Sequence, residues 1–337
     1  MTKKKTIKVL SLFDGISCAR VALERAGFKV EKYFASEIDQ HAVAMSQGNW
    51  SDIVHLGDVK NVTKKLAGGG IGLLIGGSPC QDLSIANTKR KGLAGSRSGL
   101  FYEYLRILKE VKPKYFVLEN VASMPKEARD IITKELGVEP IMIDAGLVSA
   151  QVRKRLFWTN IPGVTVPKDR GIMLNDIIHE TRGEDFDLAK YVVTGKHLEW
   201  IKKPERLKKK YCQINGSKAI TMVARQYANW GGTYIYVPEA TKKGYAIAED
   251  GDAIDISFPN SKTRRGRVGK KAKNLMTSNN ICVYKNGYIR KLTPIECERL
   301  QSLPDRYTES ASDTQRYKAI GNGFNAEVIR HIISHIK

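Results

Sequence analysis

Over its first 145 residues the chain alternates short apolar runs with amphipathic stretches, and this rhythm constrains the fold more than any other feature. The apolar runs lie at 7–13, 33–35, 73–75, 115–118 and 140–143. Helical spacing is found between them, for example at 20–26 and 100–111. Short strands alternating with helices predict βαβ units and a parallel sheet. Gly15, in the turn after the first run, favours the doubly wound, nucleotide-binding type of sheet.

The rhythm is lost between residues 161 and 290, which are irregular and rich in Gly, Lys and Tyr. Helical patterns return at 294–300 and 325–336. An insertion followed by a C-terminal return explains this order. We therefore predict an α/β fold, with a doubly wound, mostly parallel, Rossmann-like sheet and a smaller irregular domain. The boundaries divide the chain into 1–164, 165–289 and 290–337.

The charge of the chain is strongly positive, with 56 Lys and Arg against 35 Asp and Glu, a formal net charge of +21. Residues 161–290 hold 24 of the basic and 13 of the acidic residues, a net charge of +11. Basic runs at 208–210 and 262–273 alternate with Tyr, Trp and Gly in this segment. Such a pattern is typical of a surface that follows a nucleic-acid backbone. A membrane partner or a solvated, partner-free surface is the alternative that charge alone leaves open.

Several classes of protein are excluded because the sequence lacks their characteristic features. No run approaches the 18 apolar residues of a membrane span, and Lys8 interrupts the apolar run near the start. The five Cys are odd in number, widely spread and without a CxxC pair, which argues against a disulfide framework or a zinc site. We expect a cytoplasmic chain with free thiols, no metal and no membrane partner.

Acidic residues follow the first strands in series and predict a cofactor site. Glu37 lies 22 residues after Gly15, the distance at which an acidic residue holds a ribose in nucleotide-binding sheets. Asp14 and Asp58 stand at two further strand ends. Any one of the three could instead be a helix cap or a turn residue. Together they indicate a cofactor that contains a nucleoside.

The fourth apolar run leads into Gly76-Gly77-Ser78-Pro79-Cys80-Gln81. A Cys at the carboxyl edge of a parallel sheet stands where such sheets bind ligands, and the two Gly allow close backbone approach. A thiolate there would be a good nucleophile. The alternative is a buried structural Cys, which is how we interpret the other four.

Glu119 ends the fifth run, and Arg153 and Arg155 follow at alternate positions that share one strand face. A Cys, a Glu, an Arg and a nucleoside cofactor fit one reaction. Addition of a thiolate to C6 of cytosine makes C5 nucleophilic, and a Glu at N3 and the 4-amino group with an Arg at O2 would stabilise the adduct. C5 could then accept an activated methyl group, and the base would have to leave the helix.

These residues resemble the motifs of DNA (cytosine-5)-methyltransferases over nearly the whole chain outside 165–285. The matching segments are Phe13-Asp14-Gly15, Glu37, Asp58-Val59, Pro79-Cys80-Gln81, Glu119-Asn120-Val121, Gln151-Val152-Arg153-Lys154-Arg155, 290–304 and Gly321-Asn322-Gly323-Phe324. The first motif lacks a Gly-rich continuation and is similar to the eukaryotic de novo branch and to phage enzymes. No added chromatin-reading domain is present, which indicates a stand-alone prokaryotic or phage enzyme.

The resemblance implies a role for each matching residue. Cys80 would be the nucleophile, Glu119 the base-binding acid and Arg155 the O2 contact, while Arg153 would hold the site or a phosphate. S-adenosylmethionine, leaving as S-adenosylhomocysteine, would lie among Phe13, Asp14, Gly15, Glu37, Ile38, Asp58, Val59, Asn322 and Phe324. Residues 81–98 would close over DNA, and 165–289 would be the target-recognition domain that reads the major groove. The DNA contacts would include Ser84, Lys89, Arg90, Lys91, Arg97, Arg225, Arg264 and Arg265.

The implied function is C5 methylation of cytosine in a specific double-stranded DNA sequence by a monomer, in a bacterial or phage-infected cell. Similarity to the de novo branch suggests CG as the target, and a cognate restriction enzyme is a further candidate partner. One alternative is methylation of tRNA cytosine, although the Cys-Phe-Thr motif of that branch is not found here. The other is a catalytically silent DNA-binding module, against which the intact Cys80, Glu119 and Arg155 argue.

Overall fold

The structure is a computed structural model. It describes residues 5–79, 100–177 and 289–337 without a break, and shorter stretches between them. Those stretches are 191–193, 199–201, 203–209, 212–214, 216–222, 232–235, 253–255, 267–269 and 281–283.

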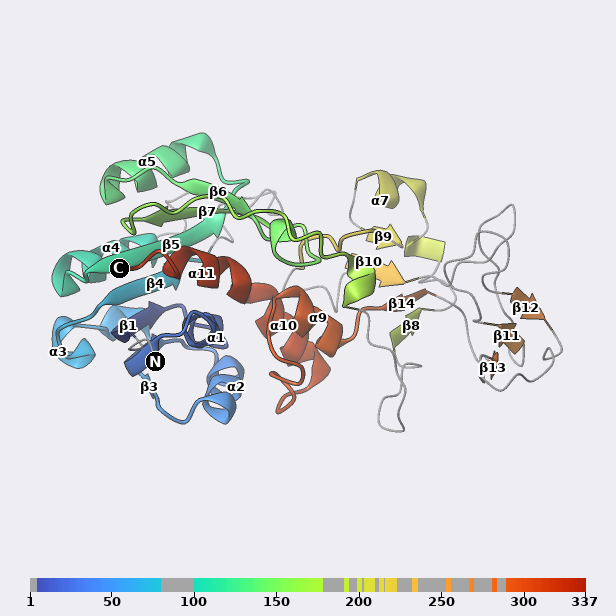
Figure 1. Ribbon diagram of the computed structural model, residues 1–337, viewed down its shortest axis with the longest axis horizontal. Coiled ribbons are helices and arrows are strands. Elements are labelled where there is room, and N and C mark those ends of the chain that lie inside the picture. The colour runs from blue at the N-terminus through green and yellow to red at the C-terminus, as the bar shows by residue number, and fades with distance from the viewer. Residues whose placement is uncertain are drawn as a thin grey trace.

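A seven-stranded sheet in the order β3-β2-β1-β4-β5-β7-β6 forms the centre of the larger lobe (Figure 1). Its strands are β1 (Thr6–Leu12), β2 (Lys29–Ser36), β3 (Ile53–His55), β4 (Leu73–Gly77), β5 (Tyr115–Val121), β6 (Ile141–Asp144) and β7 (Lys154–Thr159). Strands β1 to β5 run parallel to one another, whereas β7 is antiparallel to both β5 and β6. The predicted doubly wound, mostly parallel sheet is therefore confirmed.

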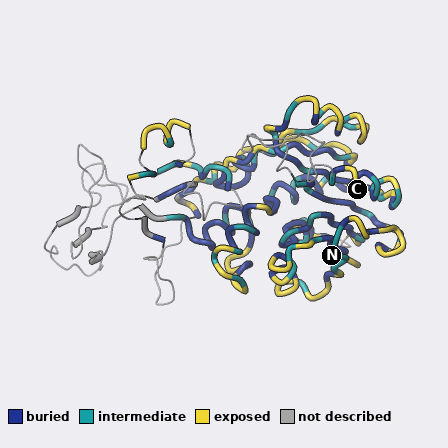
Figure 2. The backbone as a smooth tube through the Cα atoms, turned by 180° about the vertical axis from the view of Figure 1, so that it is seen from behind, coloured by how far each residue is buried: buried dark blue, intermediate teal, exposed yellow. Residues whose placement is uncertain are grey.

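Both faces of this sheet are buried, because alternate residues of the strands enter two separate hydrophobic clusters. Val9 and Ile75 belong to the cluster on one face, and their neighbours Leu10 and Leu74 belong to the cluster on the other. The central strands are consequently the most deeply buried part of the lobe (Figure 2). Burial on both faces explains why the strands are continuous apolar runs.

Helices on both faces supply the other half of each cluster. One face carries α1 (Cys18–Arg25), α2 (Gln40–Asn49) and α11 (Ala326–Ile333), and the other carries α3 (Lys64–Ala67), α4 (Leu100–Val111) and α5 (Lys126–Leu136). Gly137 follows α5 in the left-handed region, at φ 68°, which ends the helix at no steric cost to a side chain.

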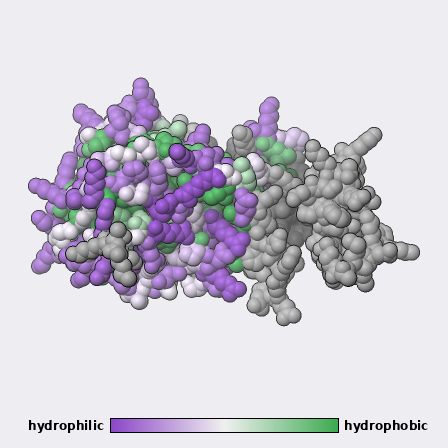
Figure 3. Space-filling model, in the orientation of Figure 1, coloured by the Kyte–Doolittle hydropathy of each residue, from purple (hydrophilic) through white to green (hydrophobic). Residues whose placement is uncertain are grey.

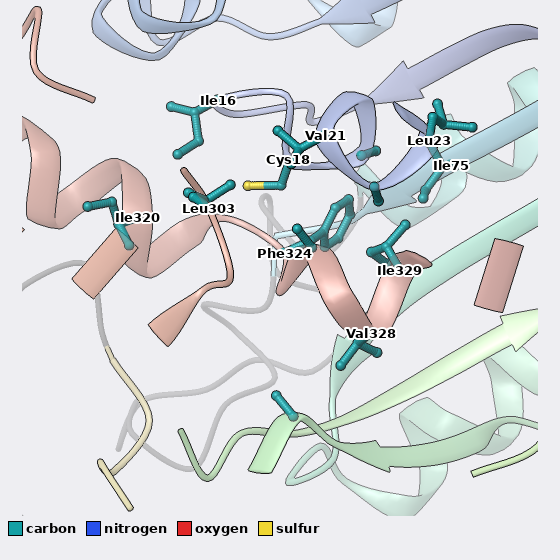
Figure 4. Packing of buried hydrophobic residues seen from close by; sticks show 14 of the residues in the cluster. Ile16, Cys18, Val21, Leu23, Ile75, Leu303, Ile320, Phe324, Val328 and Ile329 are labelled. Atoms are coloured by element: carbon teal, nitrogen blue, oxygen red, sulfur yellow. The ribbon is translucent and has the colours of Figure 1, made fainter. Parts of the chain in front are cut away.

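The last 48 residues return to the sheet through α9 (Pro294–Leu300), α10 (Asp313–Asn322) and α11. A reciprocal capping box between Thr293 and Glu296, with Pro294 in the first turn, fixes the start of α9. Figure 4 shows side chains of α11 and of its approach, among them Phe324 and Ile329, packed with Cys18 of α1. The end of the sequence thus completes the core begun by its start.

A second, smaller group of strands lies beyond α9 and α10 (Figure 1). One sheet has the order β8-β14-β10-β9, and the other has the order β12-β11-β13. The bounds are β8 (Val192–Val193), β9 (Cys212–Ile214), β10 (Gly232–Ile235), β11 (Ala253–Asp255), β12 (Arg267–Gly269), β13 (Ile281–Val283) and β14 (Ile289–Lys291), with the short helix α7 (Pro204–Lys208) beside them.

Residues 216–222 connect this second group to the large lobe through backbone pairing. Ala219 donates to the carbonyl of Ala150 at 2.7 Å and accepts from Val152 at 2.8 Å. Lys218 donates to three carbonyls of the lobe, including that of Gly146 at 2.6 Å. The boundary residues of the three predicted segments stay a prediction.

On the face of the molecule seen in Figure 3, the described residues are mostly hydrophilic, with smaller hydrophobic areas between them. None of the helices in the described part of the chain has the length and apolar character that crossing a membrane requires.

Candidate active site

A cavity of about 310 Å³ opens at the carboxyl edge of the sheet, where β1, β2, β4 and β5 end. The residues that line it come from strand ends, from α2 and α4, and from the C-terminal return. They are Phe13, Gly15, Ser36, Glu37, Ile38, Asp39, Ala42, Asp58, Val59, Gly77, Ser78, Pro79, Leu100, Glu119, Val121, Arg153, Arg155, Ala319, Gly321 and Asn322. Residues predicted for the cofactor and for the base therefore share one cavity.

Backbone amides hold the carboxylate of Glu37 in place directly after β2. Its Oε2 accepts the N–H of Gly15 at 2.9 Å, and its Oε1 accepts those of Ile38 at 2.8 Å and Asp39 at 2.9 Å. Each carboxylate oxygen can accept more than one hydrogen bond. Glu37 is thus fixed in direction and still able to bind a pair of hydroxyls.

Apolar groups stand beside Glu37 in the cavity wall. Ile38 has 69% of its surface exposed, although it is a large aliphatic residue. Phe13 also lines the cavity, and its backbone at φ 57° lies in the left-handed region that a non-glycine residue rarely adopts. Apolar side chains beside a fixed carboxylate suit an adenosine, whose base has flat, apolar faces and whose ribose carries hydroxyls. This half of the cavity fits the nucleoside cofactor that the sequence predicts.

Asp58 has two roles at the next strand end. Its Oδ1 accepts the N–H of Lys60 at 3.0 Å and so caps a short 3₁₀ turn, η1 (Val59–Asn61). It also lines the cavity, as does Val59. Asp58 is therefore both a capping residue, the alternative considered from the sequence, and part of the cavity wall.

Asp14 does not line the cavity, although it follows β1 beside Phe13 and Gly15. Its carboxylate is buried and accepts hydrogen bonds from Tyr33 at 2.7 Å and Ser17 at 2.5 Å. Burial raises the pKa of Asp14 to about 6, although the hydroxyls around it work in the opposite direction. In this structure Asp14 supports the turn from behind the cavity wall.

The C-terminal return closes the far side of the cavity. Asn322 lines the cavity at the end of α10. Phe324 lies just outside it, so close to Gly77 that a Cβ added to this glycine would stand 2.8 Å from the ring. The same Cβ would be 3.0 Å from Oε2 of Glu119, so Gly77 is the point where the strand end, the ring and the carboxylate meet.

Glu119 and Arg155 form the other end of the cavity. The Nε of Arg155 lies 2.8 Å from Oε1 of Glu119, and the two side chains are 14% and 13% exposed. They meet because β5 and β7 are neighbouring antiparallel strands with Val121 opposite Arg155. The pair presents an acceptor and planar N–H donors side by side, which is the arrangement needed to bind the polar edge of a base.

Arg153 is buried and holds main-chain carbonyls. Its guanidinium donates to the carbonyl oxygens of Gly323 at 3.1 Å, Gly321 at 3.4 Å and Met222 at 3.4 Å. It therefore joins the start of β7 to the C-terminal return and to the segment 216–222. These bonds fit the first of the two roles implied for Arg153, support of the site, and its role stays a prediction.

Asn120 supports the site, although no role could be assigned to it from the sequence. Its amide nitrogen donates to the hydroxyl of Ser78 at 3.1 Å and to the carbonyl of Ser78 at 3.3 Å. These bonds tie the end of β5 to the Ser78-Pro79 turn that precedes Cys80. Asn120 belongs to the Glu119-Asn120-Val121 motif, but its contact with Ser78 becomes apparent only once β4 and β5 are paired.

The predicted nucleophile, Cys80, directly follows the last residue described on this strand end and lies outside the described residues. The predicted DNA contacts also lie outside the described residues; they are Ser84, Lys89, Arg90, Lys91, Arg97, Arg225, Arg264 and Arg265. Among the other Cys, Cys18, Cys212 and Cys297 are buried. Burial raises the pKa of Cys18 to about 12, so that thiol stays protonated at neutral pH.

The sequence model of the C-5 cytosine-specific DNA methylases matches residues 7–337. The chain belongs to this family. It is 28% identical over 331 residues to the type II methyltransferase M1.ScrFI of Lactococcus lactis subsp. cremoris, a match that covers 98% of this chain and 78% of that relative. A segment of 120 residues is 41% identical to the orphan methyltransferase M.SPRI of Bacillus phage SPR, covering 35% of this chain and 27% of the phage protein.

Solved structures of methyltransferases share the fold. The Entamoeba histolytica methyltransferase EhMeth superposes with a TM-score of 0.67 at 17% identity, with 98% of each chain covered. The resemblance read from the motifs is thereby confirmed at the level of the family.

Proposed function

We propose that this member of the family transfers a methyl group from S-adenosylmethionine to C5 of cytosine in double-stranded DNA. The observation that carries the proposal is the shared cavity. Glu37 and Ile38 stand at one end, Glu119 and Arg155 stand at the other, and Pro79, which precedes Cys80, lies in the same wall. Cofactor and base would therefore be held within one enclosed space.

The cofactor half would hold the nucleoside. Glu37 would accept hydrogen bonds from the ribose hydroxyls, and the exposed Ile38 and Phe13 would cover the adenine. Asp58, Val59, Gly15 and Asn322 complete this wall. When bound, S-adenosylmethionine supplies the electrophilic methyl group.

The base half would bind and polarise the cytosine. Glu119, when protonated, would donate to N3 while its other oxygen accepts from the 4-amino group, and Arg155 would donate to O2. The thiolate of Cys80 would add to C6 and shift the electron pair of the C5–C6 bond to C5. After C5 has been methylated, loss of its proton would let the C6–S bond break and restore the aromatic ring. The base must be flipped from the helix to reach this pocket.

DNA would be bound by the basic, irregular part of the chain. We propose that residues 165–289, with a net charge close to that of 161–290, form the target-recognition domain, that 1–164 form the catalytic domain, and that 290–337 return to it. Binding should fall steeply as salt increases, because neutralised phosphates release counterions. The target sequence, the CG preference and a restriction partner stay predictions.

The experiment is methyl transfer from labelled S-adenosylmethionine to duplex DNA and, separately, to tRNA, with the wild type and Cys80→Ala. We expect 5-methylcytosine in DNA with the wild type and none with the variant. Methylation confined to tRNA would establish the RNA alternative. Binding of DNA without methylation of either nucleic acid would establish the silent module.

A further inference from the structure

An ion pair joins the two sides of the cofactor half of the cavity. The Nζ of Lys318, on α10, lies 2.6 Å from Oδ2 of Asp39, the residue before α2. Asp39 itself lines the cavity, and so does Ala319, which follows Lys318. The pair therefore spans from the wall built by the first 60 residues to the wall built by the C-terminal return.

Asp39 is a rigid partner for Lys318, because its other polar groups are already engaged. Its N–H donates to Oε1 of Glu37 at 2.9 Å, and its Oδ1 accepts the N–H of His41 at 3.1 Å as the N-cap of α2. Partial burial opposes ionisation of the carboxyl group, yet the hydrogen bond and charge of Lys318 lower the pKa of Asp39 below its usual value. Asp39 is thus fixed to the same turn that holds Glu37.

Lys318 lies one helical turn before Asn322, at the end of α10 that faces the cavity. Elsewhere the return is fastened to the lobe by buried bonds, such as that from the amide of Asn325 to the hydroxyl of Ser149 at 3.2 Å and that from Tyr307 to the carbonyl of Ile16 at 2.8 Å. The Lys318–Asp39 pair differs from these, because its side chains are 41% and 28% exposed. It can open and close without disturbing the core.

From this arrangement we infer that Lys318 and Asp39 form a clasp that controls how long the cofactor and its product stay bound. The inference rests on the proposed function and adds a positioning residue, Lys318, that touches neither the base nor the reacting atoms. When the clasp is closed, the last turn of α10 is pinned to the Glu37 turn and the two walls are held together. When it opens, the two walls are no longer joined at this point and S-adenosylhomocysteine can leave, while Arg153 still holds the carbonyls of Gly321 and Gly323.

The direct measurement is the rate at which S-adenosylhomocysteine leaves the full-length protein, followed by displacement in a stopped-flow instrument. Lys318→Met keeps the aliphatic stem and removes the charge. We expect it to speed release about two- to fivefold, the range in keeping with the ~0.2–1 kcal/mol of a partly exposed ion pair. Lys318→Arg should restore a rate close to that of the wild type.

Asp39→Asn distinguishes an effect of the broken clasp from an effect of the changed charge alone. Asn can still cap α2. A clasp predicts that Asp39→Asn and Lys318→Met each speed release and that the double variant is no faster than either alone, since the second change finds no bond left to break. Independent effects of two charges would instead add or cancel.

A matched control is Arg306→Met, which removes an ion pair of 3.8 Å with Glu309 in the same return, where both side chains are more than half exposed. Neither residue lines the cavity, so this variant should release the product at the wild-type rate. A second readout needs no ligand: amide hydrogen exchange at 319–322 should be faster in Lys318→Met than in Arg306→Met.

The outcomes separate the inference from the proposed function. If the wild type does not bind S-adenosylhomocysteine, the proposed function fails. If the wild type binds it, and Lys318→Met has wild-type release and wild-type exchange at 319–322, the clasp is overturned.

Discussion

The two ends of the cavity hold their carboxylates by different means. Glu37 is fixed by three backbone N–H groups from the turn in which it lies and from the turn after β1. Glu119 is instead paired with one side-chain cation, Arg155, from a neighbouring strand. Backbone donors cannot leave when a ligand arrives, whereas a side-chain partner can move.

The difference matches what each end has to do. A ribose needs a fixed acceptor, and a backbone cradle supplies one before the ligand arrives. A flipped base has to be inserted between groups that neutralise each other while it is absent. The Glu119–Arg155 pair keeps both charges satisfied in the free protein and offers both to the base. Substitutions at each end should therefore affect different steps.

The largest effect is expected at the base end. Glu119→Gln keeps the shape of the side chain but removes the acid, and general acid–base groups contribute about 10²- to 10⁴-fold to rates. Methyl transfer should fall by roughly that amount, while the affinity for S-adenosylhomocysteine changes less than about threefold, a margin below 1 kcal/mol. Single-turnover methylation and calorimetric titration measure the two quantities. A parallel loss of both would mean that the two ends are not separable.

A smaller effect with the opposite pattern is expected at the cofactor end. In Glu37→Gln one carboxylate oxygen becomes an NH₂ group, which can no longer accept a hydrogen bond from a ribose hydroxyl. Losing a hydrogen bond to a charged acceptor costs about 1.5–3 kcal/mol. Binding of S-adenosylhomocysteine should weaken by about tenfold or more, and the chemical step at saturating cofactor should change little. The affinity for S-adenosylhomocysteine and the single-turnover rate at saturating S-adenosylmethionine test this prediction. An unchanged affinity would remove Glu37 from the site.

Gly77→Ala tests the point where the two ends meet. The new Cβ would stand 2.8 Å from Phe324 and 3.0 Å from Glu119, so one of them has to shift. We expect a loss of stability of about 1–3 kcal/mol, typical of overpacking, together with slower methyl transfer. Gly48→Ala is the control, because its Cβ would meet nothing within 4 Å, in the helix α2. Urea unfolding of both variants gives the comparison.

The smallest effect on methyl transfer is expected at Asp14, which lies behind the cofactor end. Its pKa of about 6 in the folded protein is above the ordinary value of 3.8. The folded state therefore binds this proton more tightly than the unfolded state does. The stability that Asp14 contributes is fully present below about pH 4 and is lost as the pH rises through 6.

Asp14→Asn removes this titration while keeping an acceptor for Tyr33. The difference in unfolding free energy between wild type and variant should change between pH 4 and 6 and stay constant above pH 7. Urea titrations across that range measure it. A difference that is flat over the whole range would mean that Asp14 is already ionised or already protonated throughout.

Much of the site follows from strand ends, and the sequence shows where strands end. Glu37, Asp58 and Glu119 each follow or close an apolar run, so a parallel sheet brings them to one edge. The exposed Ile38 could be predicted only from its neighbour Glu37 and from the resemblance. The direction of Asp14 could not be predicted, because it depends on Tyr33, which approaches from β2, as well as on Ser17 in the same turn.

The contacts made by the C-terminal return could not be predicted from the sequence, for a physical reason. Lys318 and Asp39 are 279 residues apart, and no local pattern distinguishes this Lys from others on exposed helices. The same holds for Arg153, whose acceptors are backbone carbonyls and carry no residue signature. The reversed direction of β7 was equally hidden, since periodicity gives the strand but not its orientation.

Attack of Cys80 on cytosine within this cavity can be trapped with a duplex that carries 5-fluorocytosine at the methylated position. Fluorine in place of the C5 hydrogen blocks the elimination that frees the enzyme, so we expect a covalent protein–DNA adduct that requires S-adenosylmethionine and maps to Cys80 by mass spectrometry. Absence of the adduct in Cys80→Ala would support the assignment. An adduct at another residue, or full formation with Cys80→Ala, would contradict it.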